Sequence, residues 1–175
     1  MRRLLALGLL AIAVAVAGCN VLFPIAPAPT QGEASDDLFR LFVRSPLDRY
    51  PSALVIHVAG GVVYQGQKNR ETIFHAASPI GWRIVQLDGP AEMGGGMDQP
   101  CLSTVLDAGR IAPYPFEKAG EVDDAPPFDL AWYQAKDVHL PAGRWRFIAT
   151  MDVSLGGCGG EMHQLEASID VTVTP

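Results

Sequence analysis

The last third of the chain is patterned with a period of two residues. In a first stretch, five apolar side chains alternate with mainly polar neighbours: Trp145, Phe147, Ala149, Met151 and Val153. A second stretch repeats the pattern: Leu165, Ala167, Ile169, Val171 and Val173. Alternation of this kind places one face of a β-strand on a core and the other in water. We therefore expect two long antiparallel strands that form a hairpin, closed by a loop at residues 154–164.

Shorter strand-like runs fill the chain from residue 37 onward. They are rich in apolar and β-branched residues, and Gly or Pro separates them: residues 38–43, 53–58, 62–64, 71–75, 82–87, 102–106 and 130–133. Gly60-Gly61 is typical of a tight turn between two of these strands. No long stretch has the 3.6-residue period of a helix. The pattern predicts an all-β fold, with a single β-sandwich domain over residues 37–175.

The segment Leu140-Pro141-Ala142-Gly143-Arg144-Trp145 leads into the first long strand. It resembles the L-x-x-G-x-aromatic corner of immunoglobulin-like (Ig-like) sandwiches, with Trp145 where tyrosine is commoner. The resemblance covers residues 138–173 and implies an Ig-like antiparallel β-sandwich, an architecture that includes small proteinase-inhibitor domains. An indole lacks the hydroxyl that makes the usual hydrogen bond of this corner. The resemblance implies an architecture and no particular function.

The N-terminus has the pattern of an export signal. Two arginines, Arg2 and Arg3, precede an apolar run from Leu4 to Gly18. This is the order of a secretory signal peptide, and the run is shorter than the ~20 apolar residues of a membrane-spanning helix. Val16-Ala17-Gly18-Cys19 resembles the lipobox of bacterial lipoproteins. The resemblance implies cleavage of residues 1–18, acylation of Cys19, and anchorage to the cell membrane or outer membrane on its extracytoplasmic side.

Residues 19–36 are predicted to form a lipidated tether before the domain. Pro24, Pro27 and Pro29 favour an extended path there. Without residues 1–18 the chain keeps 157 residues, with 11 basic side chains against 19 acidic ones. Such an acidic surface argues against nucleic-acid binding and against electrostatic adhesion to anionic lipids. The lipid on Cys19 therefore has to supply the attachment to the membrane.

Cys101 and Cys158 remain once Cys19 is assigned to the lipid. Two cysteines in a small exported domain most often pair, so we expect a disulfide between them. An alternative is a copper(I) site, because sulfur and imidazole ligands suit that ion and cluster beside both cysteines: Met93, Met97, Met162 and His163. A third interpretation is that the methionines fill gaps in the packing. If the cysteines form a disulfide and the methionines only fill gaps in the packing, we expect no cofactor.

The segment 112–128 is rich in Pro with an acidic centre, and it is predicted to be a long surface loop. It is either a solvated connection or a loop presented to a protease. Nothing in the sequence has the pattern of a nucleophile elbow, a phosphate-binding loop or a zinc site. The histidines are scattered: His57, His75, His139 and His163. We therefore predict a non-enzymatic envelope component that binds an unidentified ligand or protein, with metal binding and protease inhibition as the alternatives.

Overall fold

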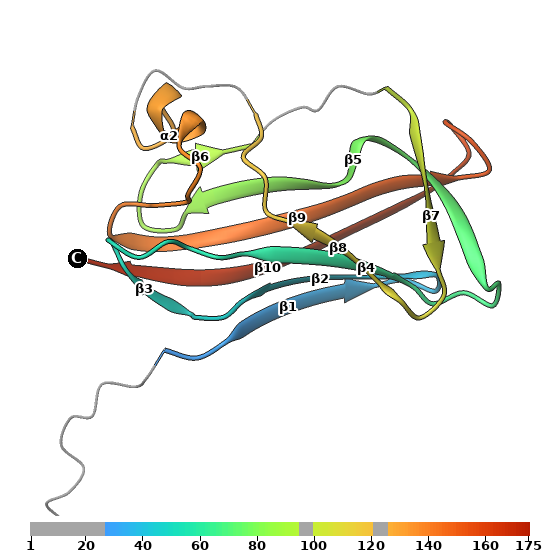
Figure 1. The fold of residues 1–175 in the computed structure, drawn as a ribbon, viewed down its shortest axis with the longest axis horizontal. Coiled ribbons are helices and arrows are strands. Elements are labelled where there is room, and N and C mark those ends of the chain that lie inside the picture. The colour runs from blue at the N-terminus through green and yellow to red at the C-terminus, as the bar shows by residue number, and fades with distance from the viewer. Residues whose placement is uncertain (1–26, 95–99, 121–125) are drawn as a thin grey trace, which may run out of the picture.

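The computed structural model describes residues 27–94, 100–120 and 126–175 and confirms an all-β fold of two packed sheets (Figure 1). The first sheet has the strand order β1-β2-β4-β8. Its strands are β1 (Thr30–Ser35), β2 (Phe39–Ser45), β4 (Ala59–Tyr64) and β8 (Ile111–Pro115). Neighbouring strands in this sheet are antiparallel. Within the described residues, no helix is both long and apolar enough to cross a membrane.

The second sheet has six strands, in the order β3-β10-β9-β5-β6, and β7 also pairs with β5. Its strands are β3 (Arg49–Pro51), β5 (Arg70–Gln86), β6 (Glu92–Met93), β7 (Leu102–Asp107), β9 (Gly143–Leu155) and β10 (Glu161–Thr174). β3 is parallel to β10, so the prediction of a purely antiparallel sandwich is wrong at this edge. The chain changes sheets between β2 and β3, and it enters the second sheet in the direction of β10.

The predicted hairpin of the C-terminal third is confirmed. β9 and β10 pair antiparallel, with Trp145 opposite Val171 and Phe147 opposite Ile169. The alternating apolar residues of both strands are buried in the core between the sheets, except Leu165, which is partly buried against that core. The turn occupies only residues 156–160, shorter than the predicted loop at 154–164. Both strands therefore extend closer to the turn than their alternating apolar residues predict.

Three local predictions are wrong, and two of the predicted strands are parts of one strand. Gly60-Gly61 lies inside β4 because aromatic rings pack on its backbone: a Cβ on Gly60 would lie 3.1 Å from Trp82 Cη2, and one on Gly61 would lie 2.5 Å from Phe42 Cζ. Residues 130–133 belong to a short helix, α2 (Leu130–Gln134), which Asp129 caps by accepting a hydrogen bond from the Trp132 N–H. The predicted strand at residues 53–58 is outside the strands, and the predicted runs 71–75 and 82–87 are one bulged strand, β5.

β1 lies inside the stretch that was predicted to be a tether. It pairs with β2 from Thr30 opposite Ser45 to Ser35 opposite Arg40. Its Gly32 sits so close to β10 that a Cβ there would collide with the backbone carbonyl of Ser168. The sheet therefore begins before the predicted domain boundary at residue 37. This polar strand is held by its backbone pairing with β2, and Gly32 allows it to lie close to β10 because glycine has no Cβ.

The corner before β9 is closed by an indole. Trp145 is fully buried, and its Nε1–H donates a 2.9 Å hydrogen bond to the carbonyl of Pro141. This bond runs back four residues along the chain, as the hydroxyl bond of a tyrosine corner does. The ring of Phe128 packs edge-on against Trp145, with centroids 5.9 Å apart. The indole N–H therefore supplies the corner hydrogen bond for which tyrosine would use its hydroxyl.

Candidate functional site

The disulfide predicted between Cys101 and Cys158 is present, with Cα atoms 6.0 Å apart. It joins the residue before β7 to the turn between β9 and β10, at the end of the sandwich opposite α2 and β6 (Figure 1). A small pocket of about 350 Å³ beside the bridge includes Asp152 and Met162 in its lining. Both cysteines are exposed, so the bridge ties two surface segments together.

Two residues of the copper alternative, Met93 and Met162, are not brought together. Met93 is buried in β6 opposite Ile84, at the far end of β5 from the disulfide. Met162 is exposed and pairs with Ser154, which is seven positions along β9 from the partner of Ile84. At ~3.3 Å per residue the two methionines are about 23 Å apart along the sheet. Met97 lies outside the described residues, and no metal-binding cluster of His, Cys, Asp or Glu is found among the described ones.

His163 lies on the face of β10 opposite to Met162, because adjacent residues of a strand point to opposite faces. Its Nδ1 is 2.8 Å from Asp36 Oδ2, and its ring packs edge-on against Phe39. Asp36 Oδ1 accepts hydrogen bonds from the backbone N–H groups of Leu38 and Phe39. One carboxylate therefore shapes the turn between β1 and β2 and fastens that turn to the second sheet.

We expect Asp36 to make folding depend on pH. Burial acts to raise the pKa of Asp36, but hydrogen bonds from His163, Phe39 and Leu38 outweigh it, so the pKa is lowered from 3.8. A carboxyl with a depressed folded pKa stabilises the fold above its unfolded pKa, and this stabilisation is lost as the pH falls through the folded pKa. Asp36→Asn should therefore cost about 1 kcal/mol near neutral pH, and progressively less below about pH 4.

Urea unfolding of both proteins across this pH range measures the effect. Asp37→Asn is the matched control, because Asp37 is the exposed neighbour in the same turn, and it should leave the free energy of unfolding unchanged at every pH. A cost for Asp36→Asn that stays constant as the pH falls would contradict the assignment.

A second cavity, larger than the pocket beside the disulfide, is a groove of about 770 Å³ at the end of the sandwich where β2 ends and β4 begins. Most of its lining is apolar: Pro29, Pro46, Val55, Ile56, Val58, Ala59, Pro115, Phe116 and Val138. The remaining lining is polar: Thr30, Gln31, Arg44, Ser45, His57, Lys136 and Asp137. Its size and mixed lining are those of a small-molecule site. We call this cavity the groove.

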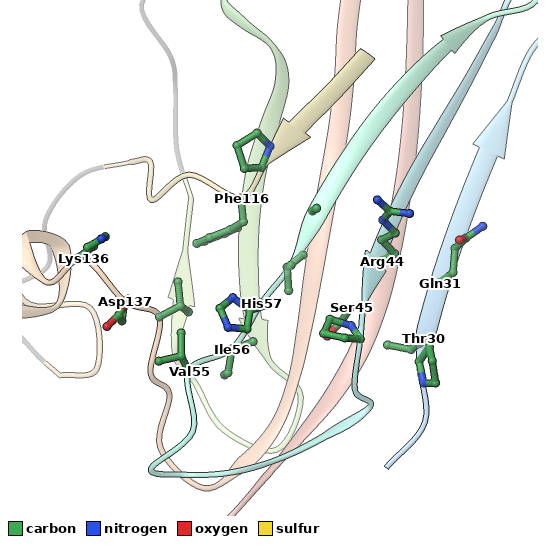
Figure 2. A pocket seen from close by; sticks show the side chains of 16 residues that line it. Thr30, Gln31, Arg44, Ser45, Val55, Ile56, His57, Phe116, Lys136 and Asp137 are labelled. Atoms are coloured by element: carbon green, nitrogen blue, oxygen red, sulfur yellow. The ribbon is translucent and has the colours of Figure 1, made fainter. Parts of the chain in front are cut away.

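The groove has two walls and a floor (Figure 2). Gln31 and Arg44, from the paired strands β1 and β2, stand on one wall. Lys136 and Asp137, which follow α2, stand on the opposite wall. Residues 55–59 pass between the walls and form the floor, from which the exposed side chain of His57 projects.

Backbone hydrogen bonds hold the floor on both sides, although it is not part of a strand. The Ile56 N–H donates to the Val138 carbonyl at 2.9 Å, and the Phe116 N–H donates to the Val58 carbonyl at 3.1 Å. The buried hydroxyl of Tyr50 reaches the carbonyl of His57 at 3.4 Å. The floor is therefore fixed before any ligand arrives, which lowers the entropy cost of binding.

Lys118 fixes the second wall. Its Nζ donates to the backbone carbonyls of Trp132, Ala135 and Asp137, at the end of α2 and just beyond it. The same ammonium lies 4.3 Å from the centroid of the Trp132 ring, in a cation–π contact. Burial lowers the pKa of Lys118, and the carboxylate of Asp137 opposes part of that change. One side chain thus caps the helix and sets the path of residues 135–137.

The other predicted residues mostly lie away from the groove or take structural roles, but Pro115 and Phe116 of the segment 112–128 line it. His75 is buried, with its ring nitrogens 2.8 Å from the Ala76 carbonyl and from Thr104 Oγ1. His139 is exposed, and its carbonyl accepts a hydrogen bond from the Trp132 indole. The segment 112–128, predicted to be a loop, begins inside β8, and its acidic centre at 121–125 lies outside the described residues. Cys19 also lies outside them.

Sequence reasoning missed the groove because five separate segments build it. Residues 29–31, 44–46, 55–59, 115–116 and 136–138 meet only in the folded chain. His57 was noted among the scattered histidines, while Arg44 and Lys136 carried no local signal. The chain matches no family model, and a search of curated proteins likewise finds no match.

Proposed function

We propose that this chain is an exported, lipid-anchored binding protein of the bacterial envelope and that the groove is its ligand site. The preformed groove of about 770 Å³ with a largely apolar lining is the observation that carries the proposal. The disulfide between Cys101 and Cys158 is consistent with a non-reducing compartment. The closed corner at Trp145 supports assigning the sandwich to the Ig-like type.

Anchorage rests on the lipobox-like segment that ends at Cys19. Cys19 and Pro29, at the rim of the groove, are only ten positions apart in the sequence, so an extended chain between them spans at most about 36 Å. The site would then work close to the membrane surface. Metabolic labelling with an alkyne fatty acid should mark the wild-type chain and leave Cys19→Ser unlabelled and released from membranes. Equal labelling of the two proteins would remove the anchor from the proposal.

Binding without catalysis is the role that the polar lining favours. The hydroxyl of Ser45 lies 2.6 Å from Tyr50 Oη and donates to the Leu47 carbonyl at 2.8 Å. These bonds hold Ser45 as part of the wall and away from a role as a nucleophile beside His57. The exposed His57 is then free to contact a ligand.

Binding of a neutral apolar dye, N-phenyl-1-naphthylamine, to the full chain in lipid nanodiscs tests the site. Ala59→Trp fills the groove with an indole and should abolish the part of the fluorescence that exceeds the nanodisc background. Leu54→Trp adds the same ring at an exposed position outside the lining and should bind dye like the wild type. Circular dichroism confirms that both variants fold. If the wild type and Ala59→Trp show the same fluorescence, the groove is not a ligand site.

A further inference from the structure

Charge is distributed unevenly along the groove. Lys136 and Asp137 are neighbours on one wall, so opposite charges stand side by side there (Figure 2). The other wall carries Arg44 together with the uncharged side chains of Gln31 and Thr30. The wall with Lys136 and Asp137 is therefore nearly neutral and the wall with Arg44 is positive, in a chain with 19 acidic and 13 basic residues.

Arg44 has no carboxylate partner among the described residues; Arg40, Arg49 and Arg144 share this lack of an ion pair, but of these four only Arg44 lines the groove. Arg70, Arg83, Arg110 and Arg146 each form an ion pair with Asp or Glu. Arg44 instead lies over the ring of Phe42, with its guanidinium carbon 5.8 Å from the centroid. A guanidinium held against a ring keeps its N–H donors available to a ligand at the rim of the groove.

The strand register explains why Arg44 is unpaired. Its direct neighbours across the sheet are Gln31 on β1 and Ala59 on β4, and neither is acidic. Glu33 is displaced by two positions, opposite Phe42, and takes part in none of the ion pairs of the described residues. In an acidic protein, an arginine whose direct neighbours are uncharged and that stands beside an apolar cavity is suited to an anion that the ligand brings.

The geometry points to a single-chain carboxylic acid as the ligand, an inference that rests on the proposed function of the groove. The carboxylate would lie at Arg44, whose planar fork matches two carboxylate oxygens, with His57 as a further hydrogen-bond partner. The hydrocarbon chain would run along the floor toward Phe116 and Val138. A cationic head group would face Arg44 and is disfavoured for that reason.

Three probes that share a ten-carbon chain test this inference: decanoate, decanol and decyltrimethylammonium. Each is used below its micelle concentration to displace the naphthylamine dye from the full chain in nanodiscs of zwitterionic lipid. We expect decanoate to bind about tenfold more tightly than decanol, and the cationic probe to bind more weakly than either. Arg44→Met should reduce the affinity for decanoate to that for decanol and leave decanol unchanged.

Two further variants separate charge from folding. Arg44→Lys keeps the charge without the fork and should give an intermediate preference for decanoate. Arg49→Met removes an exposed arginine outside the lining and should retain the full preference. Equal affinities for decanoate and decanol would overturn the inference while dye binding upheld the groove. Loss of both ligands in Arg44→Met would also overturn it, whereas absence of groove-dependent dye binding in the wild type would overturn the proposed function itself.

Discussion

Replacing both Cys101 and Cys158 with serine should lower the free energy of unfolding by about 4 kcal/mol, from the chain-entropy estimate for the disulfide loop. The two cysteines are 57 positions apart, so the bridge removes many conformations from the unfolded chain. Both side chains are exposed, and serine can occupy each position without leaving a buried void. The loss therefore measures the cross-link itself, and guanidinium unfolding of the oxidised wild type and the double variant detects it.

Two controls bracket this result. The reduced wild type should unfold at nearly the same denaturant concentration as the double variant, because both lack the cross-link. Cys19→Ser should leave the midpoint of the sandwich unchanged, because Cys19 takes no part in the bridge. A double variant within 1 kcal/mol of the oxidised wild type would show that the unfolded chain is already compact around this segment.

The sequence predicts best where local pattern and tertiary environment agree. β9 and β10 alternate because one face of each strand meets the core, and they pair directly through a short turn. The prediction of the disulfide follows from the predicted export signal and from the number of cysteines left to pair once Cys19 is assigned to the lipid. The hairpin is predicted from a two-residue period, and the disulfide is predicted from the two cysteines that remain. Neither prediction requires knowing how the two sheets pack together.

Prediction fails where a distant partner decides the local structure. Gly60-Gly61 has the pattern of a turn, but the rings of Trp82 and Phe42 need the space over an extended strand. β1 is polar and becomes a strand because β2 pairs with it and β10 lies against Gly32. The groove combines segments from residue 29 to residue 138, so its lining has no spacing to recognise.

Trp145→Ala should lower the free energy of unfolding by about 3–5 kcal/mol, the range for removal of a large buried aromatic side chain. The ring is fully buried, and it packs against Phe128, which in turn contacts Trp132 in α2 with centroids 4.9 Å apart. Loss of the indole therefore opens a cavity and loosens the support of the helix that precedes the second wall of the groove. Urea unfolding followed by circular dichroism measures the change.

Trp145→Phe separates packing from the corner hydrogen bond. Phenylalanine retains most of the apolar contact but cannot donate to the Pro141 carbonyl, and Pro141 is exposed, so water can replace the lost donor. We expect this variant to cost about 1–2 kcal/mol, clearly less than alanine. Equal costs for phenylalanine and alanine would assign the stability of the corner to the hydrogen bond. In Trp145→Phe, Phe128 still has a ring to pack against, so dye binding in the groove should survive that substitution. In Trp145→Ala the ring is lost and dye binding should weaken. This difference would link the corner before β9 to the wall that carries Lys136.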